Sequence, residues 1–291
     1  MAEPATTTVE INGFPCRVWT KGQGPRLGFL AGLGGLPRWL PFLDKLAETR
    51  TVIAPSLPGY PGATGHTELD THLDWVLAVR QLIDKAGLAG ADLIGASVGG
   101  AFAAEMAAIF PGHVAKLALI APFGLFDDKE PATDPWAQRK DNVAGLMCAN
   151  GEKWNALVAV PEGANSIEWP IEMGRASEAA ARAFWPLGNT RLEKRLGLIA
   201  APTLILWGDR DAVLPPSYAK KFAAGINGST RVETVAEAGH LAYLDSLTRS
   251  PGPFWRISAN SGRYSEPAWR LRRRFGSLLS GALGVLRGRS R

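Results

Sequence analysis

The sequence has few of the residues that build metal centres or disulfide frameworks. Its 291 residues include two cysteines, Cys16 and Cys148, and four histidines. Two cysteines so far apart cannot form a disulfide framework or a cysteine-rich zinc site. The sequence also contains neither C-x-x-C nor H-E-x-x-H, and its histidines do not cluster. We therefore expect no structural metal and no metal cofactor.

Long hydrophobic runs are absent as well. No stretch reaches the about 18 apolar residues that a membrane-spanning helix needs. The N-terminal residues MAEPATTTVEI lack the basic start and the apolar stretch of a secretory signal. Hydrophobic residues make up 46% of the chain and charged residues 20%, which is ordinary for a soluble globular protein. We expect a cytoplasmic protein with a substantial buried core.

A basic face on the main body of the chain is also missing. Of 32 basic and 27 acidic residues, ten arginines and one acid lie in residues 249–291, which leaves 22 basic and 26 acidic residues before them. The net charge of +5 therefore belongs to a C-terminal tail. Because nucleic-acid binding requires basic residues on the folded domain itself, we expect no nucleic-acid partner.

Short β-rich runs alternate with helical patterns along the chain, which is typical of a mostly parallel central sheet flanked by helices. The first two expected strands form a hairpin that turns at Asn12-Gly13. The expected strands are 7–11, 16–20, 26–31, 51–55, 91–96, 114–120, 202–208 and 231–235, and the clearest helices are 71–86, 98–110 and 217–224.

The alternation stops in the middle of the chain. Residues 122–186 contain no good strand pattern, several helical stretches and four tryptophans. We expect an α/β core made of residues 1–121 and 187–248, a helical insertion at 122–186, and the Arg-rich tail at 249–291.

The strongest local motif is Gly95-Ala96-Ser97-Val98-Gly99, a G-x-S-x-G between an expected strand and an expected helix. A serine at such a tight turn is strained and exposes its hydroxyl, and the glycines leave room for the turn. The simpler interpretation is that Ser97 only caps the helix. The strand–turn–helix context favours a nucleophile.

A nucleophilic serine needs a base, and the base needs an acid that orients it. In the chain order Ser, Asp, His, the best base is His240, which follows the last expected strand, whereas His66 and His72 precede Ser97. The loop after the strand 202–208 offers two aspartates, Asp209 and Asp211, and only one can hold the imidazole.

Four motifs in this order resemble the α/β-hydrolase superfamily over about residues 7–248. They are Pro58-Gly59-Tyr60, Gly95–Gly100, the G-x-x-D-x-x-x-P of Gly208–Pro215, and Gly239-His240. The resemblance implies the catalytic residues Ser97, Asp211 and His240, with Asp209 as a turn residue. It also implies that residues 122–186 form a helical cap over the active site.

Acyl transfer also needs backbone donors for the oxyanion. Val98 N–H, next to the serine, is one. The resemblance places the second in Ala31-Gly32-Leu33-Gly34-Gly35, where Leu33 N–H is the best candidate, although the His that similar hydrolases carry before the glycine is missing. For the substrate pocket we name residues Gly32, Trp136, Met147, Trp169 and Leu241. The tryptophans and methionines of the cap favour an apolar or aromatic acyl substrate, although most of them could simply join the cap to the core.

The sequence thus predicts a serine hydrolase that cleaves a carboxylic ester through an acyl-enzyme, without a cofactor. One alternative is a hydrolase of carbon–carbon bonds in ring-cleavage products, because Ser97-Val98-Gly99-Gly100 resembles the serine motif of those enzymes. However, His240 is followed by Leu241-Ala242-Tyr243-Leu244 and not by their Trp-rich segment. A non-catalytic binding protein on the same fold is a further alternative.

The tail allows three interpretations. Leucines between Leu271 and Leu286 recur at helical spacing among arginines, which could make a helix on a membrane surface. The same apolar stripe could replace a final helix on the sheet. We favour a dispensable extension, and expect truncation after Thr248 to leave esterase activity intact.

Overall fold

The computed structural model of the chain describes residues 3–186 and 188–246. The tail at 249–291, and with it every hypothesis about that segment, lies outside the described residues. The chain divides into a unit from Met1 to Ile257 and a short unit from Ser258 to Arg291. Only the first unit carries the described elements.

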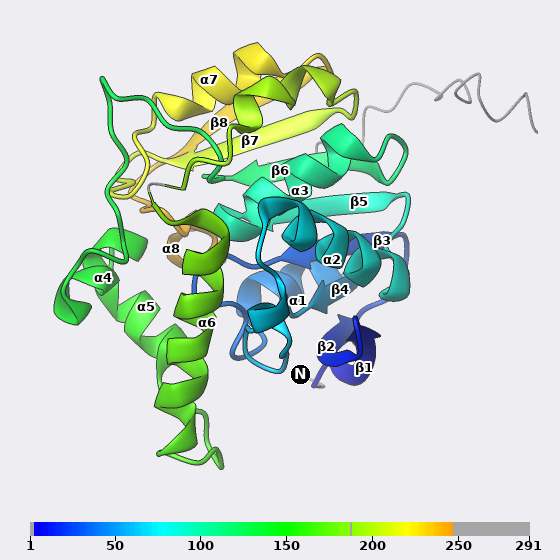
Figure 1. Cartoon of the computed structure of the whole chain (residues 1–291), viewed down its shortest axis with the longest axis vertical. Helices are drawn as coiled ribbons and strands as arrows, with labels where there is room; N and C mark the ends of the chain where they lie inside the picture. Colours follow the sequence, from blue (N-terminus) through cyan, green and yellow to red (C-terminus); the bar gives the residue numbers. More distant parts are fainter. Residues whose placement is uncertain (1–2, 187, 247–291) are drawn as a thin grey trace, which may run out of the picture. The chain divides into compact units, whose positions relative to one another are not determined.

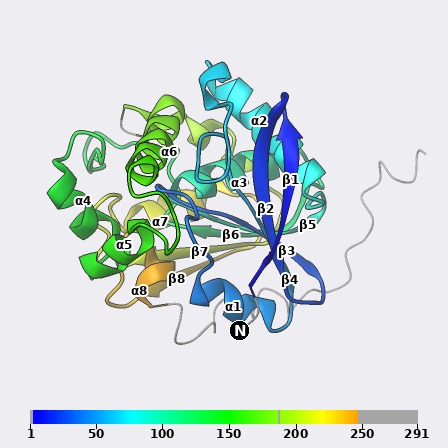
Figure 2. The ribbon, with the colours of Figure 1, turned by 90° about the horizontal axis from the view of Figure 1, so that it is seen from below.

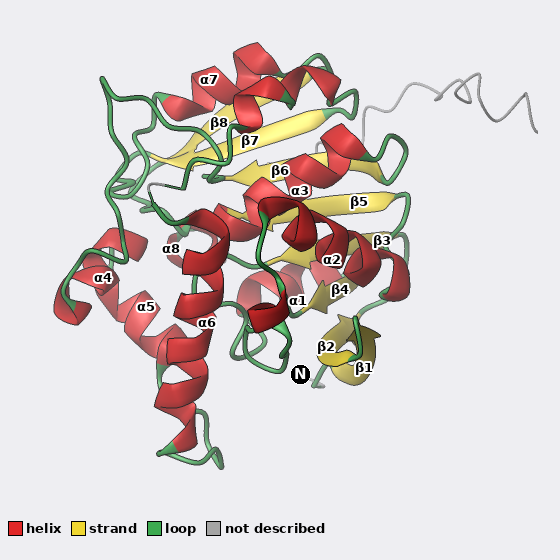
Figure 3. Cartoon of the chain, viewed as in Figure 1, coloured by secondary structure: helices red, strands yellow, loops and turns green. Residues whose placement is uncertain are grey.

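One sheet of eight strands forms the centre of the first unit (Figures 1 and 3). Its strand order is β1-β2-β4-β3-β5-β6-β7-β8. β1 and β2 run antiparallel to their neighbours, and all other pairs are parallel. The strands are β1 Ala5–Ile11, β2 Phe14–Lys21, β3 Arg26–Leu30, β4 Thr51–Pro55, β5 Ala91–Ala96, β6 Val114–Ile120, β7 Thr203–Gly208 and β8 Thr230–Val235. The expectation of a mostly parallel α/β sheet is confirmed.

Helices cover both faces of this sheet. α1 lies on one face, and α2 and α3 lie on the other (Figure 2). The helices of the core are α1 Pro41–Ala47, α2 His72–Lys85, α3 Ser97–Ile109, α7 Tyr218–Gly225 and α8 Ala242–Asp245, with short 3-10 turns at His66–Glu68, Leu192–Lys194 and Leu196–Leu198. Among the described residues, no helix is long and apolar enough to cross a membrane.

Local sequence signals explain where several elements begin and end. The β1–β2 hairpin turns at Asn12 and Gly13, which have φ values of 52° and 84°, as expected for a two-residue turn of this kind. α2 starts at a capping box in which Thr71 and Asp74 satisfy each other's backbone N–H groups. α3 is small-residue-rich and buried from Ser97 to Ala108, so it can lie close against the central strands.

The segment between β6 and β7 contains helices and no strand in its described part. These helices are α4 Lys140–Met147, α5 Gly151–Val158 and α6 Glu168–Phe184. They project from the carboxyl end of the sheet (Figures 1 and 3). One of the four tryptophans expected to add apolar lining, Trp185, directly follows α6 and is instead 61% exposed.

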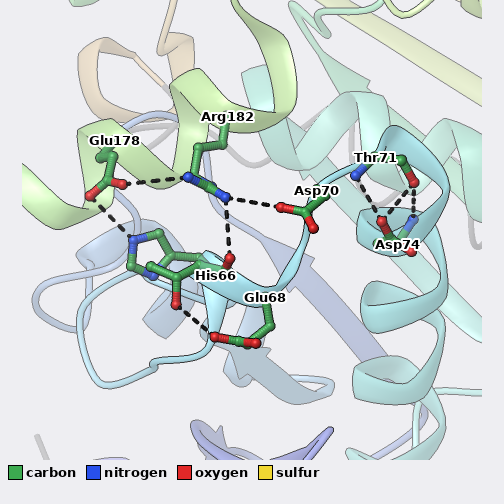
Figure 4. Close-up of polar contacts among 8 residues, drawn as sticks. His66, Glu68, Asp70, Thr71, Asp74, Glu178 and Arg182 are labelled. Atoms are coloured by element: carbon green, nitrogen blue, oxygen red, sulfur yellow. Dashed lines mark hydrogen bonds and ion pairs between the residues drawn. The ribbon is translucent and has the colours of Figure 1, made fainter.

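Polar contacts fasten α6 to the loop that precedes α2 (Figure 4). Glu178 of α6 pairs with the buried His66 at 3.4 Å, and Arg182 contacts Asp70 at 3.4 Å. Glu172 accepts a hydrogen bond of 2.8 Å from the Gly62 N–H. α6 is therefore held over the core at several points along its length.

Candidate active site

Ser97 lies at the sharp turn between β5 and α3. Its φ of 53° is in the left-handed region, which is strained for a residue with a side chain. The glycines on either side leave room for this turn: a Cβ on Gly95 would lie 2.4 Å from Gly99 O, and one on Gly99 would lie 2.3 Å from Leu30 O. The motif therefore forms the strained strand-to-helix turn that the sequence predicts.

His240 links Ser97 to Asp211. Its Nε2 lies 2.8 Å from Ser97 Oγ, and its Nδ1 lies 3.0 Å from Asp211 Oδ2. Ser97 and His240 are fully buried, and Asp211 is buried too. The three side chains come from separate loops at the carboxyl ends of β5, β7 and β8. In this geometry His240 Nε2 can accept the proton of the serine hydroxyl, and the Asp211 carboxylate can orient the imidazole through Nδ1.

Asp211 is itself held in place by its loop. Its second oxygen, Oδ1, accepts hydrogen bonds of 2.9 Å from the backbone N–H groups of both Val213 and Leu214. Asp209, the other aspartate of the loop, is exposed, and its backbone N–H bonds to Val235 O. Of the two aspartates in this loop, Asp211 is therefore the one that contacts His240, whereas Asp209 faces solvent.

The glycine-rich loop after β3 lies directly beside Ser97. A Cβ built on Gly32 would lie 2.9 Å from both Ser97 Cβ and Leu241 Cδ2. Leu33 follows in this loop, and Val98 is the second residue of α3. The N–H groups at the start of a helix have no partner within that helix. Among the described residues, no loop or cap hydrogen bond uses the N–H of Val98 or Leu33, so both can serve a ligand.

Apolar side chains surround the imidazole and the glycine-rich loop. The ring centroids of Phe123 and His240 are 5.5 Å apart. A Cβ on Gly34 would come within 2.9 Å of Trp154 and 3.6 Å of Met173, which belong to α5 and α6. α5 and α6, two helices of the segment between β6 and β7, therefore lie against the loop beside Ser97.

The structure brings together some of the expected pocket residues and separates others. Gly32 and Leu241 adjoin Ser97, and the buried Met147 accepts a 2.7 Å hydrogen bond from the Leu241 N–H through its backbone oxygen. The ring centroid of Trp136 lies 6.1 Å from that of Phe123, and Phe123 lies between Trp136 and His240 in this chain of ring contacts. Trp169 instead donates from Nε1 to Val158 O at 2.8 Å, so it joins α6 to α5.

Asp245 was not expected to take part, yet it braces the His240 loop. Its Oδ2 accepts hydrogen bonds of 2.8 Å from the N–H groups of Gly239 and Ala149, and its Oδ1 accepts one of 3.3 Å from Asn150. Ala149 and Asn150 lie between α4 and α5. One carboxylate therefore fixes the residue before His240 to the inserted helices. No sequence motif indicated this role, since the contacts join distant segments.

A second buried charged group lies deeper in the core. Glu105 of α3 is fully buried and contacts His72 Nε2 at 3.0 Å and Arg195 Nε at 2.6 Å. Burial raises its pKa, but the hydrogen bonds and charges of His72 and Arg195 outweigh that effect, so the pKa lies below its usual value. This group ties α2, α3 and the segment after α6 together.

Among the described residues, the other histidines, cysteines and acids show no arrangement typical of a metal site or of a reactive thiol. Within residues 3–186 and 188–246, no three His, Cys, Asp or Glu side chains gather as a metal site. Both cysteines are buried and free. Burial raises the pKa of Cys16 to about 12 and raises that of Cys148 further, which makes both thiols poor nucleophiles.

A family comparison agrees with this fold. The family described as alpha/beta hydrolase fold matches residues 27–247. The chain belongs to this family. Among curated proteins, this chain is 26% identical over 264 residues to the dihydrolipoyllysine-residue acetyltransferase component of the acetoin cleaving system of Cupriavidus necator. That match covers 84% of this chain and 66% of the relative, so the chain spans slightly less than two thirds of the relative's length.

Solved structures show the same fold at lower sequence identity. The alpha/beta hydrolase is similar to the 2-hydroxy-6-oxo-6-phenylhexa-2,4-dienoate hydrolase of Rhodococcus sp. strain RHA1, with a TM-score of 0.69, 17% identity, and coverage of 89% of this chain and 100% of that one. It is also similar to the naproxen esterase of Bacillus subtilis, with a TM-score of 0.68, 15% identity, and coverage of 88% and 92%.

Proposed function

We propose that this alpha/beta hydrolase cleaves carboxylic esters through an acyl-enzyme on Ser97. The observation that carries the proposal is the hydrogen-bonded chain from Ser97 Oγ through His240 to Asp211, with distances of 2.8 and 3.0 Å. These distances lie within the range that a nucleophile, its base and the orienting group require. The strained φ of Ser97 supports the same role.

In the proposed reaction, Ser97 Oγ attacks the ester carbonyl carbon while His240 Nε2 takes the hydroxyl proton. Asp211 stabilises the imidazolium that forms and fixes the tautomer in which Nδ1 carries the proton. The negative charge on the carbonyl oxygen is met by the N–H groups of Val98 and Leu33. His240 then gives its proton to the leaving alkoxide, and a water molecule releases the acyl group by the reverse sequence of proton transfers.

The side chains around the site favour an apolar or aromatic acyl group. Phe123 lies against the imidazole, and Trp154 and Met173 lie against the glycine-rich loop. A site walled by aromatic and thioether side chains gains affinity for apolar surface and offers a charged substrate no partner. The inserted helices α4–α6 would act as the cap of this site. A cytoplasmic location stays a prediction from the sequence.

A second reaction on the same residues is hydrolysis of a carbon–carbon bond in a ring-cleavage product. The Rhodococcus structure is named for such a substrate, but the similarity supports the fold alone. After His240 this chain carries Leu241 and the short helix Ala242–Asp245 in place of a Trp-rich segment. We therefore favour the ester, and a non-catalytic ligand-binding role is the remaining alternative.

The test is labelling with a fluorophosphonate probe together with turnover of short p-nitrophenyl esters. The wild-type protein should label once, on the peptide that contains Ser97, and should turn over the esters, whereas Ser97→Ala should do neither. A folded wild-type protein that does not label would exclude the serine hydrolase. Consumption of a ring-cleavage dienoate without ester turnover would select the carbon–carbon reaction.

A further inference from the structure

A cavity near α1 is not used by the proposed reaction. Its volume is about 280 Å³, and its wall comes from the residues before α1, from α1 itself, from α5 and from α8. Figure 2 shows these three helices along the same side of the molecule. None of Ser97, Asp211 and His240 is among the residues that line it. The volume lies just below the about 300 Å³ at which pockets for drug-sized ligands begin, so a small ligand fits.

The body of this cavity is apolar. Large hydrophobic and aromatic side chains supply most of its wall, namely Trp39, Leu40, Phe42, Leu157, Tyr243 and Leu244. Most of them also belong to the hydrophobic core or pack against it, so the wall is fixed before any ligand arrives. A preformed apolar cavity favours a ligand with a compact aliphatic or aromatic body.

The charges at the cavity all have one sign. Arg38 and Lys153 are the charged side chains among the residues that line it, and no acid is among them. Lys153 is exposed, and its ammonium group forms no ion pair with any residue that the structure describes. The nearby carboxylate of Asp44 bonds to Trp39 Nε1 but is paired with Lys21. The charged side chains that line the cavity therefore attract an anion.

Arg38 also has an unsatisfied donor. One of its terminal nitrogens, Nη2, donates to Ala159 O after α5, which ties the guanidinium to the inserted helices. Its Nε–H is buried and has no acceptor among the described residues. This unpaired nitrogen is enclosed by the protein, so an anion would be held by the charge of the guanidinium, for which a carboxylate is the preferred partner.

We propose that this cavity binds a small amphipathic carboxylic acid, with its apolar body on Trp39, Phe42 and Leu157 and its carboxylate between Arg38 and Lys153. The ligand would contact α5 on one side and α1 on the other, and so would join the inserted helices to the core. This inference does not depend on the hydrolase activity, because it concerns different residues and is measured as binding.

The experiment is titration of the full-length protein with octanoate by isothermal calorimetry, with 1-octanol as the uncharged comparison. Octanoate should bind at least about tenfold more tightly than octanol, since a charge-assisted contact is worth a factor of about ten or more. Lys153→Glu should weaken octanoate binding at least about tenfold. Ala156→Trp, which places a large ring in the cavity, should abolish it.

Lys140→Glu is the matched control, because it makes the same charge change at an exposed position of α4 that does not line the cavity. It should leave octanoate affinity within about twofold, and thermal melting should show that each variant is folded. Three results would overturn the proposal: no octanoate binding to the wild type, equal affinity for octanol, or binding that survives both Lys153→Glu and Ala156→Trp.

Discussion

Replacing Asp211 by Asn should nearly abolish turnover and leave the fold intact. In the wild type, Asp211 Oδ1 accepts N–H groups from Val213 and Leu214, and Oδ2 faces His240 Nδ1 at 3.0 Å. An Asn side chain has one acceptor oxygen. If that oxygen keeps the two loop N–H groups, the amide NH₂ faces His240 Nδ1 and forces the proton onto Nε2, which then cannot accept from Ser97.

The size of this effect follows from the change of tautomer. The equivalent change in a serine protease, which is a general worked example and not this protein, lowers kcat by about 10⁴. We expect a similar loss here, which corresponds to about 5.5 kcal/mol at about 1.36 kcal/mol per tenfold. The loop hydrogen bonds survive in this arrangement, so the free energy of unfolding should fall by no more than about 2 kcal/mol.

The assay is kcat on a p-nitrophenyl ester, with the rate of fluorophosphonate labelling and the melting temperature measured beside it. Asp209→Asn is the matched control, because Asp209 lies in the same loop and is exposed. It should change kcat less than about twofold. If Asp211→Asn kept most of its activity, or if Asp209→Asn were the more damaging change, the assignment of the orienting acid would be refuted.

Three further changes test other parts of the account. Asp245→Asn should lower kcat about tenfold or more, because one amide oxygen cannot accept all three N–H groups that hold the His240 loop. The control Asp141→Asn, at an exposed position, should leave kcat unchanged, and equal rates for the two variants would refute the bracing role of Asp245. Gly99→Ala should lower the free energy of unfolding, measured with urea, by about 3 kcal/mol or more, since the new Cβ would lie 2.3 Å from Leu30 O. An unchanged urea midpoint of unfolding would contradict this. Glu105→Gln should lower the melting temperature at pH 7. The difference in melting temperature between wild type and variant should shrink as the pH falls below about 4.5, because the wild-type carboxylate, whose pKa is lowered on folding, loses its stabilising contribution when it is protonated. A difference that stays constant with pH would show that the charge of Glu105 is not responsible.

The sequence predicts those parts of the fold that local patterns specify. The strands Thr51–Pro55, Ala91–Ala96 and Val114–Ile120 have the expected bounds, because short apolar runs bounded by turn residues are typical of buried strands. The other five strands and the helices α2, α3 and α7 differ from expectation by one or two residues at their ends, where fraying and capping decide the boundary. The serine turn was predictable because its glycines are a steric requirement.

Contacts between distant segments were not predictable in the same way. Trp169 joins α6 to α5, whereas Trp154 of the neighbouring helix faces Gly34, and nothing in their composition or spacing distinguishes the two. The side chain of Asp245 lies in a short helix and bonds to residues about a hundred positions earlier. Such pairings depend on the packed tertiary structure, and one sequence does not specify them.

The most direct test of the account is to trap the acyl-enzyme. A p-nitrophenyl ester is mixed with the wild-type protein, the reaction is quenched in acid during the first turnover, and the intact mass and peptides are measured. A burst of p-nitrophenol should accompany one acyl group per chain, located on Ser97. Turnover with no acyl adduct, or with the adduct on another residue, would contradict the nucleophile assigned here.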